Sequence, residues 1–154
     1  MRTTLSALPG VDSIDTPALV VDLDAMERNI ATMAAFCRQH QIAWRPHAKL
    51  HKSAELAQLL MQAGAVGACV QKTAEAEALV AGGVVDVYIS NEVISLPKLE
   101  RIAGMAKGLD AQNGHISIAV DSLEGIHRLA AALDVAGASM RVFVEIDVGQ
   151  NRCG

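Results

Sequence analysis

Aromatic residues are almost missing from this sequence. Its 154 residues include one Trp, one Tyr and two Phe, or 3% of the chain, although 51% of the residues are hydrophobic. The core must therefore be built from Ala, Val, Leu, Ile and Met. Aliphatic side chains of this kind suit helices packed closely on a parallel sheet, and a chain of this length can bury the core of one domain.

Cysteine is also scarce, and no charge of one sign dominates. Cys37, Cys69 and Cys153 are odd in number, far apart and without C-x-x-C spacing, which argues against a disulfide framework or a zinc knot. The net charge of −4, with scattered Lys and Arg, offers no basic surface for nucleic acid or an anionic membrane. Because the sequence also lacks a signal-like apolar segment after Arg2 and any run of eighteen apolar residues, we expect a soluble, cytoplasmic protein with reduced thiols.

Short β-branched runs alternate with stretches of helical periodicity along the chain. The runs expected to form strands are residues 18–22, 42–45, 66–70, 85–89, 116–120 and 141–147. Helix starts are indicated by Asp24, Ser53, Thr73 and Ser122, and helix ends by glycines 64, 82–83, 108 and 137. Strict alternation of this kind predicts a parallel sheet, either doubly wound or closed into a barrel.

Polar residues follow nearly every expected strand, which favours the barrel. They are Lys49, Gln71, Lys72, residues 90–92, Asp121 and residues 147–152. In a (β/α)8 barrel the carboxyl ends of many strands meet at one mouth, whereas a doubly wound sheet gathers its site at one switch point. A full barrel takes about 250 residues. We therefore expect residues 1–154 to form the N-terminal part of an incomplete α/β barrel of TIM type, with the remaining barrel in a longer polypeptide.

The segment Trp-Arg-Pro-His-Ala-Lys-Leu-His-Lys, residues 44–52, surrounds Lys49 with other basic or imidazole side chains. Neighbouring cations and burial both disfavour a protonated amine, so this lysine is a candidate nucleophile of the kind that forms Schiff bases. Pro46 predicts that Lys49 lies where a strand ends and a loop begins. His47 and His51 have the i, i+4 spacing of a helical metal pair, but Pro46 argues against a helix there. We expect no metal ligands in this chain, and we expect His51 to orient Lys49 or a cofactor.

Five blocks of sequence carry a resemblance to a known family. They are residues 15–23, 44–52, 69–77, 89–93 and 144–154. In order and spacing, from about residue 12 onward, they resemble the D-threonine aldolase and D-serine dehydratase family of pyridoxal-phosphate enzymes, whose barrel is similar to the N-terminal domain of alanine racemase. The resemblance implies a barrel of that type, followed by a C-terminal β domain.

The resemblance also implies roles for three residues. Lys49 matches the lysine that binds pyridoxal phosphate covalently, with Lys52 and Lys72 as the rival amines. Arg152 matches an arginine near the pyridine nitrogen, where a donor-only guanidinium requires an unprotonated ring nitrogen. Gln71 matches a glutamine near the phenolic oxygen or the substrate.

Three further residues remain open. Asn91 and Glu92 are candidates for lining the site, and Asp147 is a candidate for an ion pair with Arg45 or Arg152. In the segment around Arg152 the family usually has Gly where this chain has Asn151. Asparagine tolerates a left-handed turn, so we expect the loop to be retained.

The function implied by the resemblance is cleavage of D-configured 3-hydroxy amino acids to glycine and an aldehyde. The alternatives are dehydration of D-serine or 3-hydroxy-D-aspartate and, in a different class, a non-catalytic pyridoxal-phosphate carrier. The family's glycine-rich phosphate loop and C-terminal metal ligands do not occur in this sequence. A divalent cation (Mn, Mg or Zn) with ligands outside this chain, a small D-amino acid substrate and a homodimer are further expectations from the resemblance.

Overall fold

Five helices and four strands make up the part of the chain that this computed structural model describes, residue 10 and residues 14–154. In chain order they are α1 (Leu23–Gln39), α2 (Ala54–Gln62), β1 (Ala68–Val70), α3 (Thr73–Ala81), β2 (Asp86–Ile89), α4 (Leu96–Asp110), β3 (His115–Val120), α5 (Leu123–Ala136) and β4 (Arg141–Val144). No helix in the described part of the chain is long and apolar enough to cross a bilayer.

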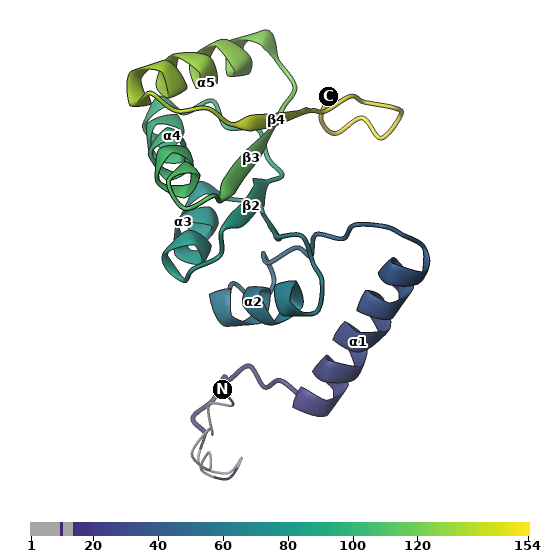
Figure 1. The fold of residues 1–154 in the computed structure, drawn as a ribbon. Helices are drawn as coiled ribbons and strands as arrows, with labels where there is room; N and C mark the ends of the chain where they lie inside the picture. The colour runs from purple at the N-terminus through teal and green to yellow at the C-terminus, as the bar shows by residue number, and fades with distance from the viewer. Residues whose placement is uncertain (1–9, 11–13) are drawn as a thin grey trace.

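The strands form one parallel sheet in the order β1-β2-β3-β4. Figure 1 shows α3, α4 and α5 together on one side of this sheet, while α1 lies apart from them. A doubly wound sheet reverses its strand order and carries helices on both faces. Sequential order with the helices on one face is the arrangement of a barrel wall, so the predicted incomplete (β/α) barrel is confirmed.

Four of the six expected strands are present, with small shifts of their ends, and two predictions were wrong. Residues 18–22 contain no strand; Asp22 instead begins α1, its Oδ1 accepting the Ala25 N–H at 2.9 Å. Residues 42–45 form no regular strand, although His47 makes an isolated parallel bridge with Cys69.

The helix signals were right at Ser53 and Ser122, which begin α2 and α5. The signal at Thr73 was also right, since Thr73 is the first residue of α3. The signal at Asp24 was wrong by two residues, because the N-cap of α1 is Asp22. Gly108 lies inside α4 and does not end it, because a single glycine lowers helix stability without requiring a turn.

Three backbone hydrogen bonds nevertheless align the segment around Pro46 with β1. The N–H groups of Val66 and Cys69 donate to the carbonyls of Trp44 and Pro46 at 3.0 and 2.8 Å, and Ala48 N–H donates to Cys69 O at 2.7 Å. Proline has no N–H to donate but its carbonyl still accepts. The segment therefore lies beside β1 as a further parallel position of the wall, and Lys49 follows directly after it.

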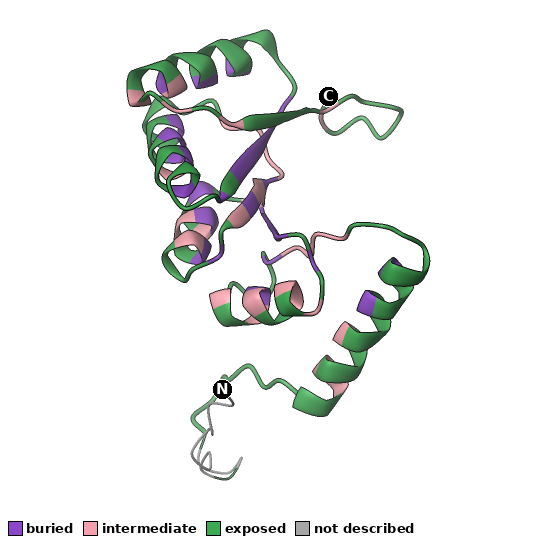
Figure 2. Ribbon diagram, viewed as in Figure 1, coloured by how far each residue is buried: buried purple, intermediate pink, exposed green. Residues whose placement is uncertain are grey.

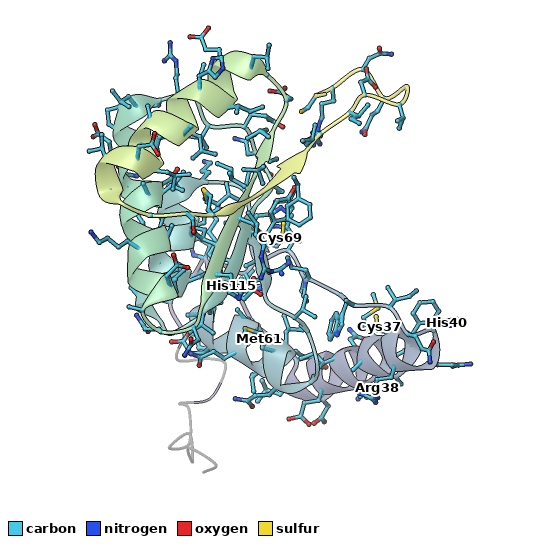
Figure 3. All side chains as sticks on the ribbon, turned by 45° about the horizontal axis from the view of Figure 1, so that its top comes forward. Cys37, Arg38, His40, Met61, Cys69 and His115 are labelled. Carbon is cyan, nitrogen blue, oxygen red and sulfur yellow. The ribbon has the colours of Figure 1, made fainter. Side chains whose placement is uncertain are left out.

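The core between the sheet and its helices is aliphatic, as the composition predicts. The largest fully buried side chains are Leu79, Ile89, Leu99, Ile102, Leu109, Ile118, Val70, Val84 and Val87. Figure 2 shows β3 and the inner sides of α3 and α4 buried, whereas β4 is exposed along its length. Phe143 and Val144 are 53% and 67% exposed, so the sheet has an open apolar edge at β4.

Gly67 lies in a closely packed position just before β1, at the opposite edge of the sheet from β4. A Cβ at this buried glycine would lie 2.5 Å from Asp86 O and would also meet the guanidinium of Arg45, which pairs with Asp86 Oδ1 at 2.7 Å. Gly104, in α4, has open space at the same position. We expect Gly67→Ala to lower the free energy of unfolding by about 1–3 kcal/mol through overpacking.

The matched control is Gly104→Ala, which should raise the free energy of unfolding by about 0.5–1 kcal/mol because alanine favours the helix. Urea unfolding of both variants measures the difference. Equal effects of the two substitutions would contradict the close packing at Gly67.

Candidate active site

A cleft of about 470 Å³ lies at the carboxyl ends of the strands. It brings together Lys49, Gln71 and Arg152, although more than 100 residues separate Lys49 from Arg152 along the chain. Tyr88 in β2 and Phe143 in β4, on either side of β3, form one wall, with ring centroids 4.8 Å apart. The three residues predicted to bind the cofactor therefore share one cleft with an aromatic side.

Lys49 lies in the turn of residues 48–51 that follows the Pro46 segment, as predicted. Its backbone N–H donates to Nδ1 of His47 at 3.3 Å. His51 repeats this pattern, because its Nδ1 accepts the Ser53 N–H at 3.1 Å. The i, i+4 spacing of the two histidines thus serves two successive turns of the loop, and no helix is present there.

The histidine that contacts Lys49 is His47, which corrects the prediction made for His51. His51 lies beside Pro46, Ala48 and Ala57 and does not line the cleft. Burial lowers the pKa of both histidines, and the Lys49 charge lowers that of His47 further. Both rings therefore favour their neutral form.

The rival amines lie elsewhere. Lys52 and Lys72 line a separate cavity of about 230 Å³ that also includes Glu75. Lys52 Nζ lies 3.7 Å from Glu75 Oε1. Neither lysine lines the cleft that contains Lys49.

Gln71 is held in place by a carboxylate. Glu75 Oε2 accepts the backbone N–H groups of Gln71 and Lys72 at 3.0 and 3.2 Å. Burial alone would raise the pKa of Glu75, but these two N–H groups and the charges of Lys52 and Lys72 lower it. An ionised Glu75 therefore fixes the chain where β1 turns into α3, which is where Gln71 enters the cleft.

Arg152 lies beside an acidic cluster. The ligating atoms of Glu92, Glu145 and Cys153 lie within 4.8 Å of one another, the one such group of three that the described residues contain. The Cys153 side chain and then the charges of Glu145 and Glu92 raise the pKa of Arg152. A hydrogen bond with Glu92 raises the pKa of Glu145, whereas Arg152 lowers it. We interpret the cluster as the countercharge of the guanidinium.

Asp147 shapes the loop that carries Arg152. Its Oδ1 accepts the N–H groups of Gly149 and Asn151 at 2.8 and 3.0 Å, and these bonds lower its pKa. Of the two ion pairs considered for Asp147, the one with Arg45 is wrong, because Arg45 pairs with Asp86. No salt bridge between Asp147 and Arg152 is present among the described residues either. Asn151 has φ +55°, which confirms the left-handed turn predicted for this asparagine.

A second groove of about 470 Å³ adjoins the cleft through Gln71. Asn91 and Glu92 line this groove rather than the cleft itself. The residues of the cleft that sequence reasoning missed include Tyr88, Phe143 and Glu145. The signal that could have assigned them to the cleft was their position near the ends of expected strands.

Residues 21–154 match the family of the alanine racemase N-terminal domain. The chain belongs to this family. It is 41% identical over 153 residues to 3-hydroxy-D-aspartate aldolase from Paracoccus denitrificans, covering 97% of this chain and 38% of that protein. It is 43% identical over 141 residues to D-threonine aldolase from Arthrobacter sp, covering 92% and 36%.

Solved structures agree with this assignment. The crystal structure of D-threonine aldolase from Filomicrobium marinum matches with a TM-score of 0.85 and 45% identity, over 92% of this chain and 37% of that one. D-threo-3-hydroxyaspartate dehydratase from Delftia sp. HT23 matches with a TM-score of 0.77 and 33% identity, over 92% and 36%. The chain thus spans little more than a third of the length of the relatives it matches.

The carboxyl groups of Glu92 and Glu145 give a test of the interpretation that they are the countercharge of Arg152. We expect Glu92→Gln to lower the pKa of Glu145, because the substitution removes a neighbouring negative charge and leaves an amide that can donate to the carboxylate. Arg152→Gln should raise the same pKa, because it removes the cation that favours ionised Glu145. Titration of the Glu145 carboxyl carbon by NMR measures both, and shifts of the same sign would contradict the arrangement.

Proposed function

We propose that this chain supplies the lysine-bearing part of a pyridoxal-phosphate lyase that cleaves D-3-hydroxy amino acids to glycine and an aldehyde. The observation that carries the proposal is the shared cleft of Lys49, Gln71 and Arg152. Relatives named as aldolases of such substrates support it at 41% and 43% identity. The enzymatic activity, the cofactor and the substrate all belong to this proposal.

The residues of the cleft fit the ring end of pyridoxal phosphate. They offer an amine at Lys49, a donor-only guanidinium at Arg152, an amide at Gln71 and an aromatic wall at Tyr88 and Phe143. No glycine-rich cradle for a phosphate lines the cleft in the described residues. The phosphate would therefore be held by residues outside this set.

Each of the three side chains has a distinct task. The amine of Lys49 would hold the cofactor covalently and return to it when product leaves. The guanidinium of Arg152 would donate to the pyridine nitrogen and keep it unprotonated. Gln71, fixed by Glu75, would donate to the phenolic oxygen or to the substrate. When bound, pyridoxal phosphate supplies an electron-withdrawing ring that stabilises negative charge at the substrate Cα.

Dehydration of 3-hydroxy-D-aspartate is the second candidate. A dehydratase from Delftia sp. matches over 92% of the chain, at 32% identity. The named aldolases match at 41% and 43%, which favours carbon–carbon cleavage. The relatives reported above are named as aldolases and a dehydratase, which favours an enzyme over the non-catalytic carrier.

We further propose a divalent cation held by ligands outside the described residues, a homodimer and a cytoplasmic location. We also propose that the open edge at β4 is covered by further barrel units of a longer chain. The exposure of Phe143 and Val144 on that edge supports this, because unpaired apolar strand edges promote aggregation.

Borohydride reduction tests the assignment of Lys49. Reduction should fix the cofactor to the peptide that contains Lys49, and Lys49→Ala should abolish both this label and the visible absorbance of the bound cofactor. Mass spectrometry of the digested holoenzyme locates the label. Lys52→Ala and Lys72→Ala are the matched controls and should keep it, since neither side chain lines the cleft. Label on Lys52 or Lys72 would refute the assignment.

The handedness of the substrate tests the proposed reaction. Lys49 would hold the planar cofactor from one face, so a substrate with its carboxylate held in place could set its reacting bond perpendicular to the ring in one configuration only. We expect the complete enzyme to release glycine and aldehyde from D-threonine or D-phenylserine and not from the L-forms. Coupled assay of the aldehyde measures this, and equal rates on both enantiomers would contradict the proposal.

A further inference from the structure

The two ring nitrogens of His47 have different partners, and both partners belong to the mouth of the barrel. Nδ1 accepts the backbone N–H of Lys49 at 3.3 Å. Nε2 lies 3.4 Å from Oγ of Ser90. The Ser90 hydroxyl in turn lies 3.1 Å from the carbonyl oxygen of Val70 and donates to it. His47 therefore connects the turn of Lys49 to the ends of β1 and β2.

These contacts determine which nitrogen carries the proton. A backbone N–H can only donate, so Nδ1 must be unprotonated to accept it. The single hydroxyl proton of Ser90 is used on Val70 O, so Ser90 Oγ is left to accept from Nε2–H of His47. The contacts with Lys49 N–H and Ser90 Oγ are satisfied together by the neutral imidazole with its proton on Nε2.

The surroundings of His47 favour the same species. Burial and the charge of Lys49 lower the pKa of His47. The pKa is raised by the charge of Glu75 and by hydrogen bonds with the Cys69 carbonyl and the Gln71 amide. The net effect is a pKa below the ordinary value for histidine. Lys49 and Glu75 are the charged groups that act on the ring, and the other contacts are neutral.

The Ser90 hydroxyl that contacts His47 is held in a fixed position. Its backbone N–H donates to the same carbonyl of Val70 at 2.9 Å, so main chain and side chain bind one acceptor. The position of its hydroxyl is therefore set by the pairing of β2 with β1 rather than by a free rotamer. Strand pairing is a precise way to place a supporting group.

We propose that Ser90 and His47 are positioning residues for Lys49, holding its turn through a neutral, Nε2-protonated imidazole. This inference rests on the proposed role of Lys49 and adds what fixes that lysine in the cleft. Protonation of His47 would place an N–H at Nδ1 against the N–H of Lys49. The contact would then be lost and the turn released.

The experiment compares Ser90→Ala, Ser90→Thr and Ser95→Ala in the complete protein. Ser90→Thr keeps the hydroxyl. Ser95→Ala is the matched control, because Ser95 begins α4 without a side-chain capping bond. Nitrogen NMR of labelled histidine reports the tautomer of His47, and amide hydrogen exchange reports the opening of the Lys49 turn. Neither measurement depends on activity.

We expect Nε2-protonated His47 in the unchanged protein and in Ser95→Ala. Ser90→Ala should give a mixture of tautomers and about tenfold faster exchange of the Lys49 amide, the change that the loss of one hydrogen bond produces. Ser90→Thr should restore both measurements.

Two results would overturn the inference while leaving the proposed function intact. One is a Ser90→Ala protein in which Lys49 is labelled and both the His47 tautomer and the Lys49 exchange are unchanged. The other is Nδ1-protonated His47 in the unchanged protein. Absence of label from Lys49 in the unchanged holoenzyme would instead refute the proposed function, and with it the role of His47 and Ser90.

Discussion

The short parallel pairing of residues 44–48 with β1 is the constraint on which the site depends. Two N–H groups of the β1 segment bind the carbonyls of Trp44 and Pro46, and Ala48 returns one bond to Cys69. Pro46 accepts without donating, so the segment joins the wall without forming a full strand. The chain then leaves the sheet at its carboxyl edge. Lys49 consequently stands in the same cleft as the residues that follow β1 and β2.

Sequence patterns predicted the four strands that pair with one another and failed at residues 18–22, which no described strand pairs with, and at residues 42–45, where Pro46 interrupts the pairing. β1 to β4 are short apolar runs bounded by turn residues, and each finds a parallel neighbour. Residues 18–22 are equally apolar, yet Val20 is 68% exposed and no described strand pairs with it. A strand exists only when another backbone supplies its hydrogen bonds, and a single sequence does not show that supply.

The sequence predicted which three residues could meet in the cleft, but not the contacts that hold them there. Lys49, Gln71 and Arg152 follow strand ends and match a family pattern, so their meeting in one cleft follows from barrel topology. The supports arise from long-range contacts. Ser90 reaches His47 across 43 residues, and Arg45 pairs with Asp86 across 41. An ion pair was predicted for Asp147, but its carboxylate instead accepts hydrogen bonds from backbone N–H groups of its own loop, which compete well with a distant cation.

The two ends of the cleft differ in how they handle protons. At the Lys49 end, burial and then the charge of Lys49 lower the pKa of His47 and favour its neutral form. At the Arg152 end, the Cys153, Glu145 and Glu92 side chains stabilise the guanidinium, while Glu92 makes Glu145 harder to ionise. A guanidinium that acts only as a donor is stabilised by acidic neighbours. The asymmetry follows from which side chains the ends of the parallel strands bring together.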